Sequence, residues 1–237
     1  MTPPPTGELE RLTRDLEHRS AEEILRWASR CYGAGLTCAS SLGLEDVVVI
    51  DLIARAGLPI DIFTLDTGLL FPETYDLKRQ IAAKYGITIR SVVPQFTVAE
   101  QGEREGPELW RREPNRCCEL RKVLPLQATL ARFDAWITAI RRDQTPERAN
   151  APVVSWDGRF GLVKINPLVR WTFDEVTAYV QMYDVPHNPL HDRNYPSIGC
   201  QPCTSPVTAG EDPRSGRWRG IEKTECGLHL KAQAAET

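Results

Sequence analysis

The first half of the chain alternates between helical and extended hydrophobic patterns. Leucines recur at helical spacing between Glu8 and Arg30, and Ser20 stands where a cap would begin a second helical stretch. β-rich runs cover 36–40, 59–65 and 87–93, and helical stretches at 45–56 and 73–85 separate them. This β-α-β-α-β order predicts a parallel sheet with helices on both faces.

The second half of the chain is less regular. Residues 95–116 are polar without a strong period, so we expect a mobile segment or a frayed helix there. Further elements are predicted as a helix over 120–133 starting properly near Pro125, strands at 135–140, 153–156 and 162–165, and a helix over 173–183 capped by Thr172. Beyond Pro186, prolines and glycines predict mostly loop.

The length of 237 residues is long for one domain and short for two. We expect a disordered N-terminus over 1–7, one α/β domain over 8–208 and a flexible tail over 209–237. A net charge of -3 gives no general attraction to nucleic acid or membranes, and no stretch is apolar enough to span a bilayer. The N-terminus lacks the basic and apolar regions of a secretory signal. Without such a signal, the seven cysteines of the chain predict a cytoplasmic protein whose thiols serve metals or catalysis.

Two cysteine pairs are the most specific chemical feature. They are Cys117-Cys118 and the C-x-x-C of Cys200 and Cys203. Four thiolates match the ligands of an iron–sulfur cluster and also those of a structural zinc. Four buried apolar cysteines, or a redox disulfide that leaves the first pair unexplained, are the plainer alternatives. The remaining thiols before the pairs are expected in or near the core; they are Cys31 and Cys38.

Three turns follow predicted strands and therefore meet at one edge of the sheet. The first, Ser40-Ser41-Leu42-Gly43, would let backbone N–H groups approach a phosphate, or would serve as an ordinary helix cap. The others are Asp66-Thr67-Gly68, which also suits a plain turn, and Arg141-Arg142-Asp143, whose basic residues could bind phosphate or sulfate oxygens or form a solvated charged turn. Neither G-x-x-x-x-G-K-[ST] nor G-x-G-x-x-G is present, so a Walker ATPase and a Rossmann dehydrogenase are not favoured.

Two further groups suit chemistry beside the cysteine pairs. Arg121-Lys122 would offset the charge of an anionic cluster, or would form a solvated helix face. Cys226, in the C-terminal segment Glu225-Cys226-Gly227-Leu228-His229, suits a redox nucleophile that meets a second protein, or is an incidental thiol.

Together these segments resemble the assimilatory sulfonucleotide reductases, the adenylyl-sulfate and phosphoadenylyl-sulfate reductase family. The resemblance runs from about Ser40 to His229. It rests on SSLGLED (40–46), LDTGLLFPETY (65–75), RCCELRK (116–122), RRDQ (141–144), NPL (166–168), YPSIGCQPCT (195–204), GRW (216–218) and ECGLH (225–229). It implies a PP-loop-type, adenine nucleotide α-hydrolase-like α/β fold with a mostly parallel sheet.

The resemblance also implies a mechanism and its residues. A [4Fe–4S] cluster is implied on Cys117, Cys118, Cys200 and Cys203. The thiolate of Cys226 would attack the sulfate sulfur of the nucleotide, and thioredoxin or a glutaredoxin-like dithiol would release sulfite from the S-sulfonate. Substrate-binding residues are implied at Ser40, Ser41, Gly43, Asp66, Thr67, Gly68, Arg121, Lys122, Arg214, Arg217 and His229.

The substrate expected from the resemblance is adenosine 5'-phosphosulfate (APS), because family members with both cysteine pairs generally prefer it. The alternative is phosphoadenosine phosphosulfate (PAPS), which would give sulfite and adenosine 3',5'-bisphosphate. Leu69 stands where many APS enzymes have arginine, and residues 71–75 are similar to those of PAPS enzymes. Rival interpretations are a PP-loop ATP pyrophosphatase or sulfur transferase acting on tRNA, and a zinc-stabilised binding module. We expect no nucleic-acid or membrane partner, and homo-oligomers are left open.

Overall fold

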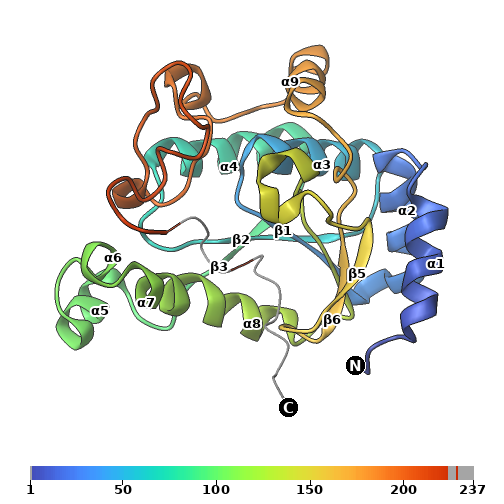
Figure 1. The fold of residues 1–237 in the computed structure, drawn as a ribbon, viewed down its shortest axis with the longest axis horizontal. Helices are drawn as coiled ribbons and strands as arrows, with labels where there is room; N and C mark the ends of the chain where they lie inside the picture. Colours follow the sequence, from blue (N-terminus) through green and yellow to red (C-terminus); the bar gives the residue numbers. More distant parts are fainter. Residues whose placement is uncertain (1, 224–227, 229–237) are drawn as a thin grey trace.

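A computed structural model describes residues 2–223 and residue 228, and shows one central sheet with helices on both faces (Figure 1). The strands are β1 Leu36–Ser40, β2 Asp61–Leu65, β3 Ile89–Val92, β4 Ala135–Ile137, β5 Val154–Asp157 and β6 Leu162–Ile165. Their order is β3-β2-β1-β4-β6-β5. All neighbours pair in parallel except β5 and β6. The predicted fold class, a mostly parallel α/β sheet, is confirmed.

The strand order reverses at β1, which positions the site. The chain moves outward from β1 through β2 to β3, and later returns to place β4 on the other side of β1. Thr37 is therefore paired with Asp61 on one side and with Trp136 on the other. In open α/β sheets, ligands bind beyond the carboxyl ends of the strands at such a reversal.

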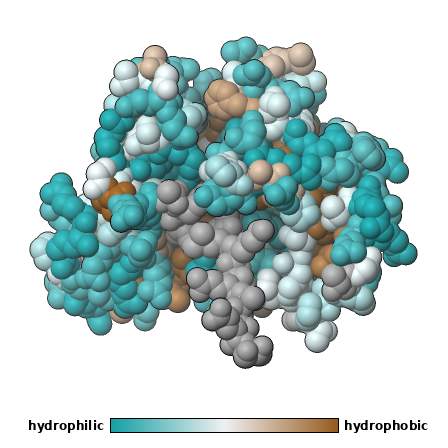
Figure 2. All heavy atoms as spheres, viewed as in Figure 1, coloured by the Kyte–Doolittle hydropathy of each residue, from teal (hydrophilic) through white to brown (hydrophobic). Residues whose placement is uncertain are grey.

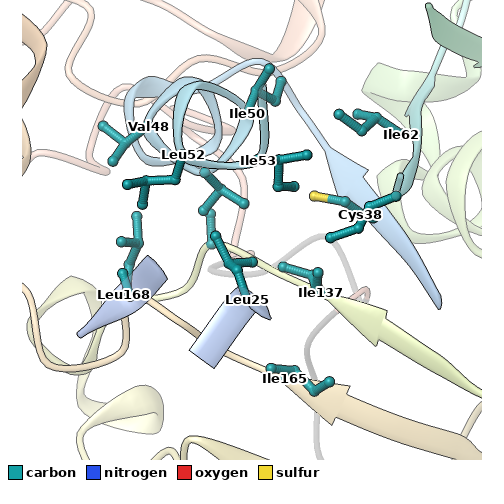
Figure 3. Packing of buried hydrophobic residues seen from close by; sticks show 14 of the residues in the cluster. Leu25, Cys38, Val48, Ile50, Leu52, Ile53, Ile62, Ile137, Ile165 and Leu168 are labelled. Atoms are coloured by element: carbon teal, nitrogen blue, oxygen red, sulfur yellow. The ribbon is translucent and has the colours of Figure 1, made fainter. Parts of the chain in front are cut away.

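Two separate cores hold the helices against the two faces of the sheet. Figure 3 shows Leu25 of α2 and Ile53 of α3 packing against the strand residue Ile137. On the other face, α8 packs Leu126 and Leu130 against Phe63, Trp136 and Leu162 of the sheet. The main helices are α1 Thr6–Leu16, α2 Ala21–Tyr32, α3 Leu44–Arg55, α4 Pro72–Tyr85, α8 Leu124–Leu130 and α9 Phe173–Met182. Parallel strands buried on both faces need this double cover.

Predicted helix ends are confirmed where local chemistry sets them. Ser20 forms a capping box with Glu23 at the start of α2, and Thr172 forms one with Glu175 at the start of α9. Gly86 ends α4 in the left-handed conformation at φ 64°. Helix α1 begins at Thr6, two residues before the predicted start.

The expectation for residues 95–116 is wrong, because three short helices replace a mobile or frayed segment. They are α5 Val98–Glu105, α6 Leu109–Arg112 and α7 Pro114–Cys118. Gln101 and Leu109 are the buried residues of the first two, so no apolar period marks them. A π-helical turn over Glu119–Val123 then leads into α8. Short 3-10 turns lie at Gly33–Gly35, Arg142–Gln144, Pro146–Arg148, His191–Arg193 and Gln201–Cys203.

The remaining expectations concern the surface and the isolated thiols. Cys38 is buried in β1 as expected, whereas Cys31 is exposed, so its assignment to the core is wrong. One face of the molecule is mostly hydrophilic, with scattered apolar groups (Figure 2). No helix in the described part of the chain is long and apolar enough to cross a membrane.

Candidate active site

A cavity of about 370 Å³ lies where β1, β2 and β4 end. This volume falls within the usual range for small-molecule sites. Ser40 and Ser41 line it after β1, Thr67 lines it after β2, and Arg141 lines it after β4. The three turns that the sequence places at one sheet edge therefore do meet around one space.

In the loop after β1, backbone N–H groups are already bonded within the loop and the helix that follows it. Asp46 accepts hydrogen bonds at Oδ2 from Ser41 N at 2.8 Å, from Ser41 Oγ at 2.6 Å and from Gly43 N at 3.2 Å. Leu42 N donates to Ser40 Oγ at 3.0 Å. Burial raises the pKa of Asp46 to about 6, although the bond from Ser41 opposes that rise. In this structure the loop is therefore the ordinary helix cap that its sequence also allowed.

Only one of the three residues in the turn after β2 lines the cavity. Thr67 lines the cavity, whereas Asp66 and Gly68 lie outside that lining. Asp66 Oδ1 accepts from Gly68 N at 3.0 Å and from the Tyr75 hydroxyl at 2.7 Å, so it stabilises the turn. Gly68 has φ +68°, and a Cβ there would stand 3.2 Å from Arg121 Nη2. Glycine is needed because the guanidinium approaches the backbone so closely.

Basic side chains form much of the polar wall of the cavity. These are Lys122, Arg141, Arg148, Arg214 and Arg217. Arg217 Nη1 donates to Ser197 Oγ at 3.2 Å and to Ile198 O at 3.3 Å, which holds its guanidinium in place. Such a wall suits a ligand with phosphate and sulfate oxygens.

Arg141, from the third of the predicted turns, and His191 also line the cavity. Arg141 pairs with Glu45 at 3.0 Å and with Asp143, so carboxylates neutralise this buried cation. His191 also lines the cavity, with Nδ1 2.9 Å from the Tyr195 carbonyl, and burial lowers its pKa. The sequence placed the Arg141-Arg142-Asp143 turn at this edge of the sheet, and Arg141 does line the cavity. For His191, in a loop far along the chain, the local sequence offers no such signal.

The apolar end of the cavity is built from the second core. Phe63, Leu126 and Trp136 line it, and Leu228 packs there as well. The predicted nucleophile Cys226 and the predicted substrate contact His229 lie outside the described residues.

The four paired cysteines line a second, much smaller space of about 10 Å³. Cys117 and Cys118 end α7, directly before the π-helical turn. Cys200 pairs with Leu70 in an isolated antiparallel bridge, which ties the C-x-x-C loop to the turn after β2. Segments about 80 residues apart in sequence thus bring their thiols to one small space.

The donor set of this second site is four thiols around one space. Burial raises the pKa of Cys117 to about 12 and that of Cys203 to about 11, and the neighbouring thiols act in the same direction. Metal ligation is the usual way to stabilise thiolates in such a site. In the described ranges, no three His, Cys, Asp or Glu side chains are arranged to hold a single metal ion. By number and type, the four thiols around this space match the ligands of an iron–sulfur cluster and also those of a structural zinc.

Two residues line both spaces and form a common wall. Lys122 and Cys200 belong to the cavity and to the thiol site. Thr67 strengthens the wall, because its Oγ1 lies 3.3 Å from Cys200 Sγ and its carbonyl accepts from Arg121 Nε at 2.5 Å. Arg121 itself is buried beside the thiols and does not line the larger cavity.

Comparison with known proteins gives matches over most of the chain. Residues 35–206 match the family described as "Phosphoadenosine phosphosulfate reductase domain". "Adenosine 5'-phosphosulfate reductase" of Geobacillus kaustophilus is 48% identical over 217 residues, covering 91% of this chain and 92% of the relative. "Phosphoadenosine 5'-phosphosulfate reductase" of Gloeobacter violaceus is 47% identical over 224 residues, covering 93% of each. The crystal structure of phosphoadenylyl-sulfate reductase from Candida auris, a phosphate complex, has a TM-score of 0.77 at 32% identity, covering 86% of this chain and 98% of that chain.

Proposed function

The chain belongs to the phosphoadenosine phosphosulfate reductase family, and we propose that it reduces APS to sulfite and AMP. It is an adenylyl-sulfate reductase, as several relatives at 45–48% identity over about 90% of the chain are named. The observation that carries the assignment in this chain is the common wall. Lys122 and Cys200 join a cavity rich in cations to a site with four thiols.

The cations of the cavity bind the phosphosulfate group. Lys122, Arg214 and Arg217 face a ligand that carries one phosphate and one sulfate, and charge-assisted bonds orient both. Because the bonds from Arg217 to Ser197 and Ile198 fix that guanidinium beforehand, little reorganisation is needed when charge develops on the leaving phosphate. Ser40, Ser41 and Thr67 provide the neutral polar groups of the same cavity.

Cys226 is the nucleophile of the reaction. Its thiolate attacks the sulfate sulfur, an S–S bond forms, and the bond from sulfur to the phosphate oxygen breaks. AMP leaves with that electron pair, and the S-sulfonate of Cys226 remains. One thiolate of a thioredoxin- or glutaredoxin-like dithiol then attacks Cys226 Sγ, and sulfite leaves with the electron pair of the S–S bond. The second thiol resolves the mixed disulfide, so the dithiol supplies both electrons. Leu228, two positions after Cys226, lines the cavity.

Cys117, Cys118, Cys200 and Cys203 hold a [4Fe–4S] cluster in this proposal. The fit rests on four thiols around one space, three of them buried, with Arg121 and Lys122 beside them to offset negative charge. When bound, the cluster supplies a fixed, polarisable charge next to the phosphosulfate site. The electrons come from the dithiol.

A relative named for PAPS at 47% identity makes PAPS the second candidate substrate. Initial rates of sulfite release from APS and from PAPS, with thioredoxin as reductant and protein prepared without oxygen, separate the two. We expect kcat/KM for APS to be higher by at least about tenfold. A higher value for PAPS would overturn the substrate assignment, and no sulfite from either would overturn the reaction.

A further inference from the structure

Helix α5 buries a polar side chain. Among its residues, Val98–Glu105, Gln101 is the one that is fully buried, with 4% of its surface exposed. Glutamine is rarely buried without a specific hydrogen-bond partner. The one fully buried side chain of this short helix is therefore a polar amide that needs a partner inside the protein.

The partner of that amide is a buried cation. Gln101 Oε1 accepts from Arg121 Nη1 at 3.0 Å, and the Phe96 carbonyl accepts from the same nitrogen at 3.3 Å. Arg121 Nε donates to the Thr67 carbonyl at 2.5 Å. Oxygens from three positions of the chain thus fix one guanidinium, which is only 3% exposed. Bonds that involve a charged donor are stronger than neutral ones, so each constrains the position of Arg121.

Arg121 in turn fixes the position of Thr67, which contacts Cys200 of the common wall. Thr67, whose carbonyl it holds, contacts Cys200 Sγ through its hydroxyl at 3.3 Å and lines the larger cavity. A Cβ at Gly68 would lie 3.2 Å from Arg121 Nη2, so backbone and guanidinium pack without spare room. A displaced guanidinium would move the turn after β2, and with it the wall shared by the thiols and the cavity.

We propose that Gln101 is a positioning residue for the reductase reaction. Through Arg121 it holds Thr67 against Cys200, and it keeps a cation beside the four thiols. The inference rests on the proposed function, because it assigns Gln101 a role in setting that site. Lys122, Arg214 and Arg217 line the larger cavity, whereas Gln101 and Arg121 do not, so substrate binding is expected to depend on Gln101 little and turnover strongly.

Two substitutions separate positioning from mere packing. Gln101→Met keeps the size of the side chain but removes the acceptor, and we expect kcat for APS to fall about tenfold with KM within about twofold. Gln101→Glu keeps an acceptor for Arg121 and is expected to retain most of kcat. Its added negative charge should lower the midpoint potential of the cluster, because a negative charge near a cluster disfavours the more reduced state. The same changes at the exposed Gln181 of α9 are the matched controls.

The outcomes decide the inference separately from the proposed function. Wild-type kcat in Gln101→Met would overturn it, as would a potential that does not move in Gln101→Glu while kcat falls as far as in Gln101→Met. If the wild type forms no sulfite, the proposed reaction is refuted. The role of Gln101 is then tested by whether Gln101→Glu lowers the midpoint potential of the cluster-loaded protein. If the wild type holds no cluster, the proposed cofactor is refuted. The role of Gln101 is then tested by whether Gln101→Met lowers kcat for APS.

Discussion

Arg121 and Lys122 are neighbours with different environments. Arg121 is buried and bonds to Thr67, Phe96 and Gln101, so its charge acts on the thiol site and on the turn after β2. Lys122 lines both the thiol site and the larger cavity. The π-helical turn Glu119–Val123 carries both residues. Such turns are rare and occur frequently at functional sites, so we ascribe the delivery of two cations to two places to this local geometry.

Asp46 gives a prediction at the scale of one residue. Its pKa is raised by burial to about 6, from an ordinary value of 3.8. The folded state then keeps a proton that the unfolded chain releases, so stability falls as pH rises through this window and the full penalty is present above it. Asp46→Asn removes this titration. Relative to wild type, we expect it to gain up to about 3 kcal/mol in unfolding free energy between about pH 4 and pH 7.

Urea unfolding of both proteins across that range measures the difference. Asp143→Asn is the control, because Asp143 is also an acid of the cavity lining but lies on another turn. Curves for wild type and Asp46→Asn that stay parallel at every pH would show that burial does not raise the pKa of Asp46.

At the scale of elements, the sequence predicts those whose pattern is local. The strands 36–40 and 162–165 match β1 and β6, because β-rich runs bounded by turn residues suffice to identify them. Helices α5 to α7 were missed because each is short and buries only one or two residues, such as Gln101 of α5, so no apolar period reveals them. The capping box of Thr97 and Glu100 was the available signal. It is a short motif and was not sufficient by itself.

In the candidate site, too, the features that follow from local patterns could be predicted and those that depend on the folded chain could not. That three turns share one edge follows from strand order, and so it could be predicted from the β-α-β rhythm. The separation of Asp66 and Gly68 from Thr67, and the pairing of Arg141 with Glu45, depend on side-chain directions after the chain has folded. The pair of Arg141 with Glu45 and the approach of Gly68 to Arg121 join positions far apart in the sequence, and Asp66 is held by Gly68 and Tyr75 through a geometry that exists only once the turn has formed.

At the scale of the whole molecule, the thiol site connects two distant parts of the chain. Cys117 and Cys118 end α7, and Cys203 belongs to the loop that is bridged to Leu70. We expect Cys203→Ser to lose the visible absorption of the cluster and sulfite release together, and to lower the thermal unfolding temperature. The physical reason is that bound metal contributes its binding free energy to folding.

Cys31→Ser is the matched control, because Cys31 is an exposed thiol outside both sites. Absorption spectra, iron content and thermal unfolding of the two variants and the wild type make the comparison. Full activity in a colourless Cys203→Ser protein would count against any role of the cluster.

The most direct measurement is the mass of the protein after incubation with APS without a dithiol. The account predicts one added SO₃ group, located on the peptide that contains Cys226, with AMP released in equal amount. Thioredoxin should then remove the group as sulfite, and Cys226→Ser should acquire none. An SO₃ group on another cysteine, or AMP release from Cys226→Ser at the wild-type rate, would contradict the account.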